Sequence, residues 1–304
     1  MSFMFEKVAV LGLGLIGSSI CHGIKAKGLA KIVVGHAKSA ETRHVAVEIG
    51  LVSQAYENAD EAVKGADLVI ICTPVGVVGT LAATVGPHLM QGSIFTDVGS
   101  VKACVVRDCS AYIPPGVHFI PGHPIAGTEQ SGPRSGFAEV FHGRWCILTP
   151  VPGSDPAAVA KLTKFWEALG SNVDVMAADH HDLVLAITSH LPHLIAYNTV
   201  ATAADLETVT NSEVIKYSAS GFRDFTRIAA SDPTMWRDVF LNNKEAVLEM
   251  LGRFTEELAV LQRAVRWGDG ETLFNLFTRA REVRRGIIAA GQDTAAPDFG
   301  RGKS

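Results

Sequence analysis

A short segment in the middle of this 304-residue chain combines proton-transfer chemistry with backbone-bending residues. It reads Gly-His-Pro-Ile-Ala-Gly-Thr-Glu from residue 122 to 129, and so many glycines and prolines predict a loop. Histidine can exchange a proton near neutral pH, which makes His123 the first candidate for acid–base work, with Thr128 and Glu129 beside it. A histidine in a loop can also be only a structural hydrogen-bonding group, and this alternative stays open on the segment alone.

Two further segments of chemical interest lie in the C-terminal half. Ser-His-Leu-Pro-His, residues 189 to 193, falls in an apolar helical stretch, and Asp-Phe-Thr-Arg, residues 224 to 227, falls in a polar break. An arginine such as Arg227 is always charged and can hold a carboxylate through two parallel N–H bonds. Taken separately, a buried histidine bonded to backbone and a surface arginine are the simpler interpretations of His190, His193 and Arg227.

A glycine-rich segment near the N-terminus predicts a dinucleotide site. It reads Gly-Leu-Gly-Leu-Ile-Gly from residue 12 to 17, after an expected strand and at the start of an expected helix. Gly12 would make the tight turn, Gly14 would let the backbone approach the pyrophosphate, and Gly17 would let the helix pack closely on the sheet. Leu15 and Ile16 would open the helix, whose N-terminal N–H groups attract phosphate.

The end of the second expected strand indicates which dinucleotide binds. Enzymes that use NAD commonly have Asp or Glu there, but no acid occurs between residues 32 and 39. The position falls on His36 or Ala37, and Lys38, Ser39 and Arg43 follow. A lysine, a hydroxyl and an arginine suit a phosphate, so we expect NADP to be favoured and NAD to be accepted. A solvated basic surface is the alternative.

Two other loops should face the nicotinamide, because ligands collect at the carboxyl ends of strands in open α/β sheets. Thr73 and Pro74 follow one expected strand, and Asp97 and Ser100 follow the next. Ser100 also precedes a helical stretch, so a catalytic role and a helix-capping role are equally open for it.

The elements that position these residues belong to the α/β class. Val- and Ile-rich apolar runs alternate with helical patterns in the first half, which predicts a Rossmann-type dinucleotide-binding domain. The expected strands are Lys7–Leu11, Lys31–Gly35, Leu68–Cys72, Ser93–Asp97, Val117–Ile120 and Trp145–Thr149. Proline and glycine cluster at residues 149–156, where Ser154 or Asp155 could cap a helix with Pro156 in its first turn.

We therefore expect a dinucleotide-binding domain over residues 1–152 and an all-helical domain over residues 153–304, apart from one short strand at Asn172–Met176. Apolar residues from Phe240 to Val265 recur at three- and four-residue spacings, which predicts one long helix with an apolar stripe. The stripe packs inside its own domain or pairs in part with a second subunit, and the tail from Gly291 is expected to fray.

Composition argues for a small-molecule partner. With 47% hydrophobic residues, 19% charged residues and a net charge of −4, the chain lacks the basic surface that nucleic-acid binding needs. No apolar run approaches the roughly 20 residues of a membrane span, and no export signal is visible. Five cysteines without a C-x-x-C pair favour reduced thiols over disulfides or a metal site. These features predict a soluble, cytoplasmic protein without a bound metal.

Read together and in order, the motifs resemble one family. The set G-L-G-L-I-G-S, D-V-G-S-V-K, G-H-P-I-A-G-T-E, S-H-L-P-H and D-F-T-R-I-A-x-S-D-P-x-M-W-R-D is similar to that of the prephenate/arogenate (cyclohexadienyl) dehydrogenases of tyrosine biosynthesis. The resemblance covers about residues 6 to 250. The last three motifs are specific to this family, whereas the glycine motif fits many dehydrogenases.

The resemblance implies an NAD(P)-dependent oxidative decarboxylation that leaves an aromatic ring. By its place in the motif, His123 would accept a hydrogen bond from the C4 hydroxyl of the substrate, and it must be neutral to do so. Ser100 would bond the same hydroxyl or orient His123. His193 would contact the substrate from the helical domain, with His190 in support.

The resemblance also implies how the substrate is held. Arg227 would bind the ring carboxylate, and Glu129 and Thr128 would line the mouth of a cleft between the two domains. Family members are usually homodimers, and tyrosine is a plausible inhibitor because it shares the ring of the product. Ser220-Gly221 replaces the consecutive glycines that relatives often have, which leaves the flexibility of this gate open.

Two alternatives remain. Another two-domain NAD(P)-dependent dehydrogenase or reductase, such as a β-hydroxyacid dehydrogenase, would share the fold but does not account for the histidine loop together with D-F-T-R. A nicotinamide-sensing protein without chemistry would have no need for Ser100, His123 and Arg227. No residue distinguishes prephenate from arogenate as the substrate.

Overall fold

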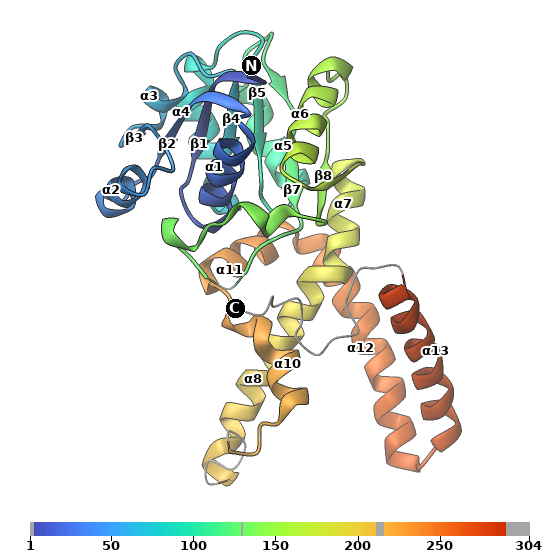
Figure 1. Cartoon of the computed structure of the whole chain (residues 1–304). Coiled ribbons are helices and arrows are strands. Elements are labelled where there is room, and N and C mark those ends of the chain that lie inside the picture. The colour runs from blue at the N-terminus through green and yellow to red at the C-terminus, as the bar shows by residue number, and fades with distance from the viewer. Residues whose placement is uncertain (1–2, 129, 211–215, 290–304) are drawn as a thin grey trace. The chain divides into compact units, whose positions relative to one another are not determined.

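The computed structural model describes residues 3–128, 130–210 and 216–289, and the chain forms two compact units, residues 1–247 and 248–304. The first unit begins with alternating strands and helices (Figure 1). These are β1 (Phe5–Leu11), α1 (Leu15–Lys27), β2 (Ala30–His36), α2 (Ala40–Glu48), β3 (Gln54–Tyr56), α3 (Ala59–Val63), β4 (Leu68–Ile71), α4 (Val78–Val85), β5 (Ile94–Asp97), α5 (Ala103–Cys109) and β6 (His118–Phe119).

The six strands form one parallel sheet in the order β3-β2-β1-β4-β5-β6. This is the Rossmann order, so the α/β class with an N-terminal dinucleotide fold is confirmed. The order reverses between β1 and β4, which places the loops after these two strands next to each other at a crevice where ligands bind in such sheets. Strand β3, only three residues long and polar, was not predicted.

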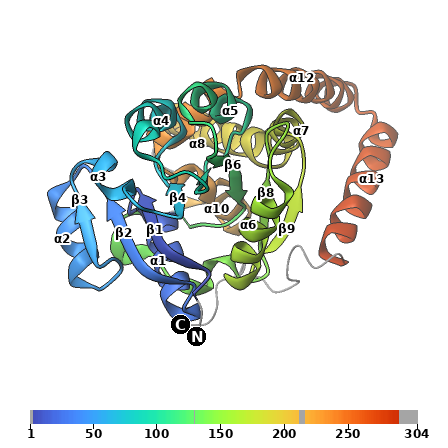
Figure 2. The same ribbon diagram turned by 90° about the horizontal axis from the view of Figure 1, so that it is seen from above.

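Alternation along the strands supplies two cores, because neighbouring side chains in a strand point to opposite faces. Val8 and Val10 of β1 face the core that contains residues of α1 and of α6 (Pro156–Ala168), whereas Ala9 and Leu11 face the core that contains residues of α3, α4 and α5. Figure 2 shows these two groups of helices on opposite sides of the sheet.

A second, three-stranded sheet carries the histidine segment. It consists of β7 (Gly122–Pro124), β8 (Trp145–Leu148) and β9 (Asn172–Val175), with β7 antiparallel and β9 parallel to β8. The prediction of a loop around His123 is therefore wrong for residues 122–124, which form a strand. A strand of three residues tolerates Pro124 at its end because little of the ladder depends on that residue's missing N–H.

The segment between β8 and the helical region packs with the N-terminal half. Asp155 caps α6 by accepting the Ala157 N–H at 2.8 Å, with Pro156 in the first turn, as the sequence predicts. Phe165 and Trp166 of α6 are buried in the core next to β1, and β9 pairs with β8. The domain boundary expected at residue 152 would assign α6 and β9 to the helical domain, although α6 packs on the core next to β1 and β9 pairs with β8.

The remainder of the first unit is helical. It contains α7 (Ala178–Leu185), a π-helical turn at Ala186–His190, α8 (Leu191–Thr210), α10 (Ser220–Thr226), a 3₁₀ turn at Arg227–Ala230 and α11 (Pro233–Asn242). Pro192 has no N–H, so it cannot continue the regular bond pattern across this junction, and the π turn ends two residues before it. Trp236 and Val239 of α11 are buried against the core formed by α4 and α5.

The second unit contains most of α12 (Lys244–Trp267) and α13 (Gly270–Ala289). The single helix expected from Phe240 onward is interrupted at Asn243, where the side chain bonds to α7 and the π turn. Several apolar side chains of this unit are at least half exposed, namely Leu258, Val265, Phe274 and Phe277. No helix within the described residues is long and apolar enough to cross a membrane. The tail from Gly291 lies outside the described residues.

Candidate active site

The glycine motif forms a backbone cradle between β1 and α1. Gly12 has φ +108°, and a Cβ on it would lie 2.6 Å from the carbonyl oxygen of Cys72. A Cβ on Gly17 would collide with the Gly12 carbonyl, whereas a Cβ on Gly14 would meet nothing within 4 Å. Gly14 also begins α1 without a side-chain cap, and no acid occupies the first turn. Open space before an uncapped helix N-terminus fits a pyrophosphate group.

At the end of β2, some side chains are exposed and others are already hydrogen-bonded within the protein. His36 is buried and its Nδ1 lies 3.2 Å from the Tyr56 carbonyl, so its ring faces β3, and burial lowers its pKa. Ser39 caps α2 by accepting the Thr42 N–H at 3.2 Å, and Lys38 is exposed. Lys38 is therefore the charged side chain that remains exposed at this end of the strand.

Arg43 is held by its own loop. Its Nη1 donates to the carbonyls of Ala37 and Lys38 at 2.8 Å, and its Nη2 pairs with Glu57 at 3.1 Å. The guanidinium is largely buried and the Glu57 carboxylate is exposed. This pairing was not predicted, because Glu57 follows β3 and only the sheet brings it to the end of β2.

The loops after β4 and β5 flank the reversal of strand order. In the first loop, Oγ1 of Thr73 is buried and has no hydrogen-bond partner among the described residues, and Pro74 precedes a short 3₁₀ turn. In the second loop, Asp97 is 1% exposed and both of its carboxylate oxygens are used. Thr73 thus offers a free polar group, whereas Asp97 is committed to holding the loop.

Lys102 is a functional candidate that sequence reasoning missed. It is fully buried, its Nζ lies 2.5 Å from Asp97 Oδ2, and it donates to the Gly122 carbonyl at 2.7 Å. The Gly122 N–H in turn donates to Asp97 Oδ1 at 3.2 Å. This buried ion pair connects β5 to the strand of His123. A lysine and an aspartate in one apolar stretch, in D-V-G-S-V-K, were the available signal.

His123 is 8% exposed and its ring lies against that of His181 on α7. Nδ1 of His123 is 2.8 Å from Nε2 of His181, and Nδ1 of His181 is 2.8 Å from Oδ1 of Asp182. Sequence reasoning missed His181 and Asp182 as well. The signal was the run His-His-Asp at residues 180–182, whose partner lies 58 residues earlier in the chain.

The electrostatic surroundings keep the histidines neutral. Burial lowers the pKa of His123 well below 6.5, and charge on His181, Lys102 and His190 would lower it further. Burial likewise lowers the pKa of His181, against the opposing effect of Asp182. A neutral imidazole can accept a hydrogen bond through one ring nitrogen, which an imidazolium cannot.

Ser100 lies in the same neighbourhood, between Asp97 and α5. The N-cap position of α5 is Lys102, and its N–H and that of Ala103 donate to Asp182 at 2.7 and 2.9 Å. The capping alternative for Ser100 is therefore wrong for this helix. Burial lowers the pKa of His190 to about 4, and the backbone of Ser100, which lies beside this histidine, opposes that shift.

The S-H-L-P-H motif places its histidines differently. His190 is fully buried, and Asn243 donates to its Nδ1 at 3.0 Å. His193 is partly exposed, donates from Nδ1 to the Ser189 carbonyl at 2.8 Å, and stacks on Trp236 with ring centroids 3.6 Å apart. Of the two, His193 presents a ring nitrogen to its surroundings, and His190 supports the packing behind it.

Arg227 is exposed at the end of α10. Burial lowers the pKa of His193, the Ser189 backbone opposes this shift, and the positive charge of the nearby Arg227 lowers the pKa further. Thr128 is exposed and accepts the Gln130 N–H at 3.2 Å, so it shapes the turn after β7. Glu129 lies outside the described residues.

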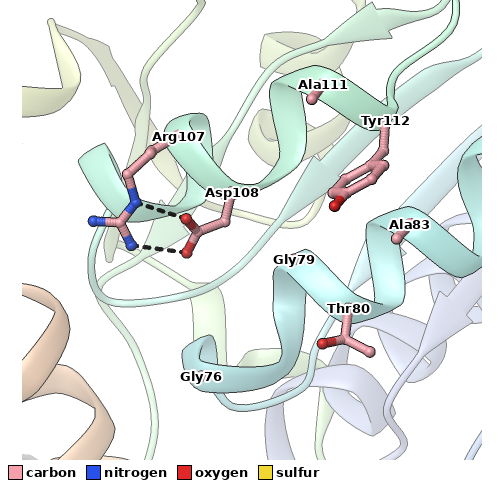
Figure 3. Close-up of a pocket in the computed structure, with 8 residues that line it drawn as sticks. All are labelled: Gly76, Gly79, Thr80, Ala83, Arg107, Asp108, Ala111 and Tyr112. Carbon is pink, nitrogen blue, oxygen red and sulfur yellow. Dashed lines mark hydrogen bonds and ion pairs between the residues drawn. The ribbon is translucent and has the colours of Figure 1, made fainter.

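A surface hollow of about 560 Å³ lies between α4 and α5 (Figure 3). It is lined by Gly76, Gly79, Thr80, Ala83, Arg107, Asp108, Ala111 and Tyr112. Arg107 and Asp108 form two hydrogen bonds of 2.6 and 2.9 Å at its rim, and none of the expected site residues lines it. Its one charged pair is already satisfied, so the hollow is not a candidate active site.

Comparisons with known proteins agree with this arrangement. The family model described as the nucleotide-binding domain of prephenate dehydrogenase matches residues 20–175, and the one described as its dimerization domain matches residues 177–279. A cyclohexadienyl dehydrogenase of Zymomonas mobilis is 39% identical over 281 residues, covering 92% of this chain and 96% of the relative. A prephenate dehydrogenase of Bacillus subtilis is 33% identical over 300 residues, covering 98% and 80%.

A solved structure is similar over nearly the whole chain. It is a prephenate dehydrogenase from A. aeolicus in complex with hydroxyphenyl propionate and NAD+, with a TM-score of 0.87, 31% identity, and coverage of 94% of this chain and 99% of that one. The two domain matches, these relatives and the Rossmann cradle agree. The chain belongs to the prephenate/arogenate dehydrogenase family of NAD(P)-dependent oxidoreductases.

Proposed function

We propose that this enzyme oxidatively decarboxylates prephenate, arogenate or both, giving 4-hydroxyphenylpyruvate or tyrosine. The observation that carries the proposal is the buried His123, whose lowered pKa keeps it neutral, next to a Rossmann sheet in a chain of this family. A neutral histidine can accept a hydrogen bond from a substrate hydroxyl at the moment when that oxygen becomes a carbonyl.

The reaction needs one hydroxyl polarised and one C–H bond aimed. Hydride leaves C4 of the substrate ring, the ring carboxylate leaves as carbon dioxide, and the ring becomes aromatic. When bound, the nicotinamide supplies the hydride acceptor. His123 stabilises the developing carbonyl by drawing on the hydroxyl proton, and Ser100 bonds the same hydroxyl or orients His123. These contributions are positioning and electrostatics.

Residues from the helical part bind the substrate. Arg227 holds the ring carboxylate, and His193, stacked on Trp236, contacts the ring, with His190 behind it. The proximity of Arg227 to His193 supports their joint role. Thr128 and Glu129 line the mouth of the site.

NADP is the favoured dinucleotide and NAD is accepted. Gly12, Gly14, Leu15, Ile16 and Gly17 hold the pyrophosphate, and Thr73, Pro74 and the loop held by Asp97 border the nicotinamide. The preference for NADP is supported by the exposed Lys38 at the end of β2 and by the lack of an acid in residues 32–39, where NAD enzymes carry one.

Four further expectations belong to this function. A homodimer through the C-terminal helices is supported by the match to a dimerization domain and by the exposed apolar side chains of α12 and α13. The domain boundary is placed after β9, near residue 175. Tyrosine inhibits by competing with substrate, and a cytoplasmic location is supported by five free cysteines.

The test is steady-state reduction of NAD and of NADP with prephenate and with arogenate, four combinations in all. Turnover of at least one substrate, with carbon dioxide released in equal amount to reduced cofactor, is the expected result. Binding of the dinucleotide without reduction by either substrate would instead identify a nicotinamide-sensing protein. Millimolar tyrosine, added to the best combination, should raise KM and leave kcat unchanged.

A further inference from the structure

His123, His181 and Asp182 form one continuous chain of hydrogen bonds. The two bonds of this chain are both 2.8 Å long, from Nδ1 of His123 to Nε2 of His181 and from Nδ1 of His181 to Oδ1 of Asp182. The chain crosses from strand β7 to helix α7. Among the described residues, no hydrogen bond engages Nε2 of His123, so this nitrogen is left for a ligand.

The far end of the chain fixes where every proton lies. The Asp182 carboxylate accepts the backbone N–H groups of Lys102 and Ala103 in addition to the bond from His181. A carboxylate that only accepts requires a proton on Nδ1 of His181. Neutral His181 then has a bare Nε2, which requires a proton on Nδ1 of His123.

We propose that His181 and Asp182 are positioning residues that hold His123 in its Nδ1–H tautomer, so that Nε2 accepts the hydrogen bond from the substrate hydroxyl. A neutral histidine otherwise places its proton on either nitrogen, and a proton on Nε2 would oppose the hydroxyl proton. The assignment rests on the proposed function for the identity of the hydroxyl, but the tautomer itself follows from the hydrogen bonds.

The position of Asp182 is itself fixed by several contacts. Its two bonds to the start of α5 are joined by a third, from Asn243 Nδ2 to its backbone carbonyl at 2.9 Å. Oδ1 accepts both the Lys102 N–H and the bond from His181, and Oδ2 accepts the Ala103 N–H. Asp182→Leu removes the acceptor for Nδ1 of His181, so neither His181 nor His123 is then held to one tautomer.

The first test is imidazole ¹⁵N NMR of the dinucleotide-bound enzyme at pH 7.5, a measurement that needs no turnover. In the wild type, His123 should be protonated at Nδ1 and bare at Nε2. In Asp182→Leu a protonated Nε2 should appear at His123. A wild-type His123 with its proton on Nε2, or an unchanged pattern in Asp182→Leu, would overturn the proposal.

The second test is kinetic. Asp182→Leu should lower kcat by a factor on the order of 10 to 10⁴ and change KM less than about threefold, because the wrong histidine tautomer costs about 10⁴ in a serine protease triad. The matched control is Asp179→Leu, which removes an exposed carboxylate in the first turn of the same helix and should keep kcat within about twofold. A normal kcat in Asp182→Leu, with its tautomer changed, would refute the role in catalysis.

A pair of variants at His181 covers the case in which Asp182→Leu does not fold. His181→Gln keeps an acceptor for Nδ1 of His123 and should retain its tautomer and at least about a tenth of kcat. His181→Leu removes the acceptor and should lose both, and equal kcat in the two variants would contradict the proposal. Absence of turnover in the wild type would refute the proposed function alone, since the NMR result still decides the tautomer.

Discussion

The dinucleotide cradle and the histidine cluster lie close to the same sheet but are built in opposite ways. The cradle works through backbone and missing side chains: Gly12 and Gly17 have no room for a Cβ, and Gly14 leaves space open. The cluster works through buried polar side chains that pair with one another, such as Asp97 with Lys102 in an ion pair and His123 with His181 in a hydrogen bond. Added atoms should therefore damage the cradle, and lost protons or charges should damage the cluster.

The largest effect is expected in the cluster, at the atom that meets the substrate. His123→Asn keeps similar size but loses the basic acceptor, so kcat should fall by a factor on the order of 10² to 10⁴ with little change in KM. Steady-state kinetics with the best substrate measures both. A kcat near that of the wild type would remove His123 from the mechanism.

The pH profile of the wild type checks the same histidine. Burial, together with Lys102, His181 and His190, lowers the pKa of His123 well below 6.5, so the acceptor form persists as pH falls through 6.5. The rate should therefore stay level from pH 8 to 6.5 and decline only at lower pH. An acid limb at or above pH 6.5 would contradict this environment.

The second effect tests the buried ion pair. Lys102→Met leaves the Asp97 carboxylate buried without its partner, which should lower the free energy of unfolding by about 3–5 kcal/mol. The control is Lys64→Met, whose pair with Asp60 is exposed and 3.9 Å long and should contribute about 1 kcal/mol or less. Urea titrations measure the free energy of unfolding of both variants. Equal losses would show that the buried ion pair of Lys102 stabilises the fold no more than an exposed one.

The third effect lies at the edge of the site. Arg227→Ala should weaken substrate binding by about 2–5 kcal/mol, because the ring carboxylate would be desolvated without its charged partner, and the loss should fall mainly on KM. Arg107→Ala removes another exposed arginine, paired with Asp108 on α5, and serves as the control. If KM for prephenate and for arogenate is unchanged, Arg227 is only a surface residue.

The same contrast explains what the sequence could predict. The cradle is local: a strand, three glycines and a helix within a few residues specify its geometry, and the alternating pattern specifies the parallel sheet. The cluster is assembled from segments far apart, and the bonds from Asp182 to α5 join residues 79 and 80 positions apart. His123 was found through its motif, but its partner His181 was not, because no periodicity links β7 to α7. Strands β3 and β7 were missed because three residues are too few to show alternation.

The fourth effect tests the cradle by adding a single methyl group. Gly17→Ala places a Cβ against the Gly12 carbonyl, where backbone must shift, and should cost about 1–3 kcal/mol of stability together with dinucleotide affinity. Gly14→Ala meets no atom within 4 Å, so its stability should be unchanged while its methyl group obstructs the pyrophosphate. Thermal unfolding and dinucleotide titration separate the two, and a stable Gly17→Ala would contradict the close packing.

The smallest effect concerns the choice of dinucleotide at the end of β2. The wild type should have a higher kcat/KM with NADP than with NAD, because Lys38 is exposed and residues 32–39 contain no acid where NAD enzymes carry one. A wild-type preference for NAD of tenfold or more, about 1.4 kcal/mol, would refute this.

Ala37→Asp should move the ratio of kcat/KM toward NAD for two reasons. Its carboxylate repels a 2′-phosphate and can accept the ribose hydroxyl in its place, and it would compete with Glu57 for Arg43, whose Nη1 already bonds the Ala37 carbonyl at 2.8 Å. Thr84→Asp on α4 adds the same charge away from β2 and should leave the ratio unchanged, so an equal shift in both variants would reduce the effect to net charge.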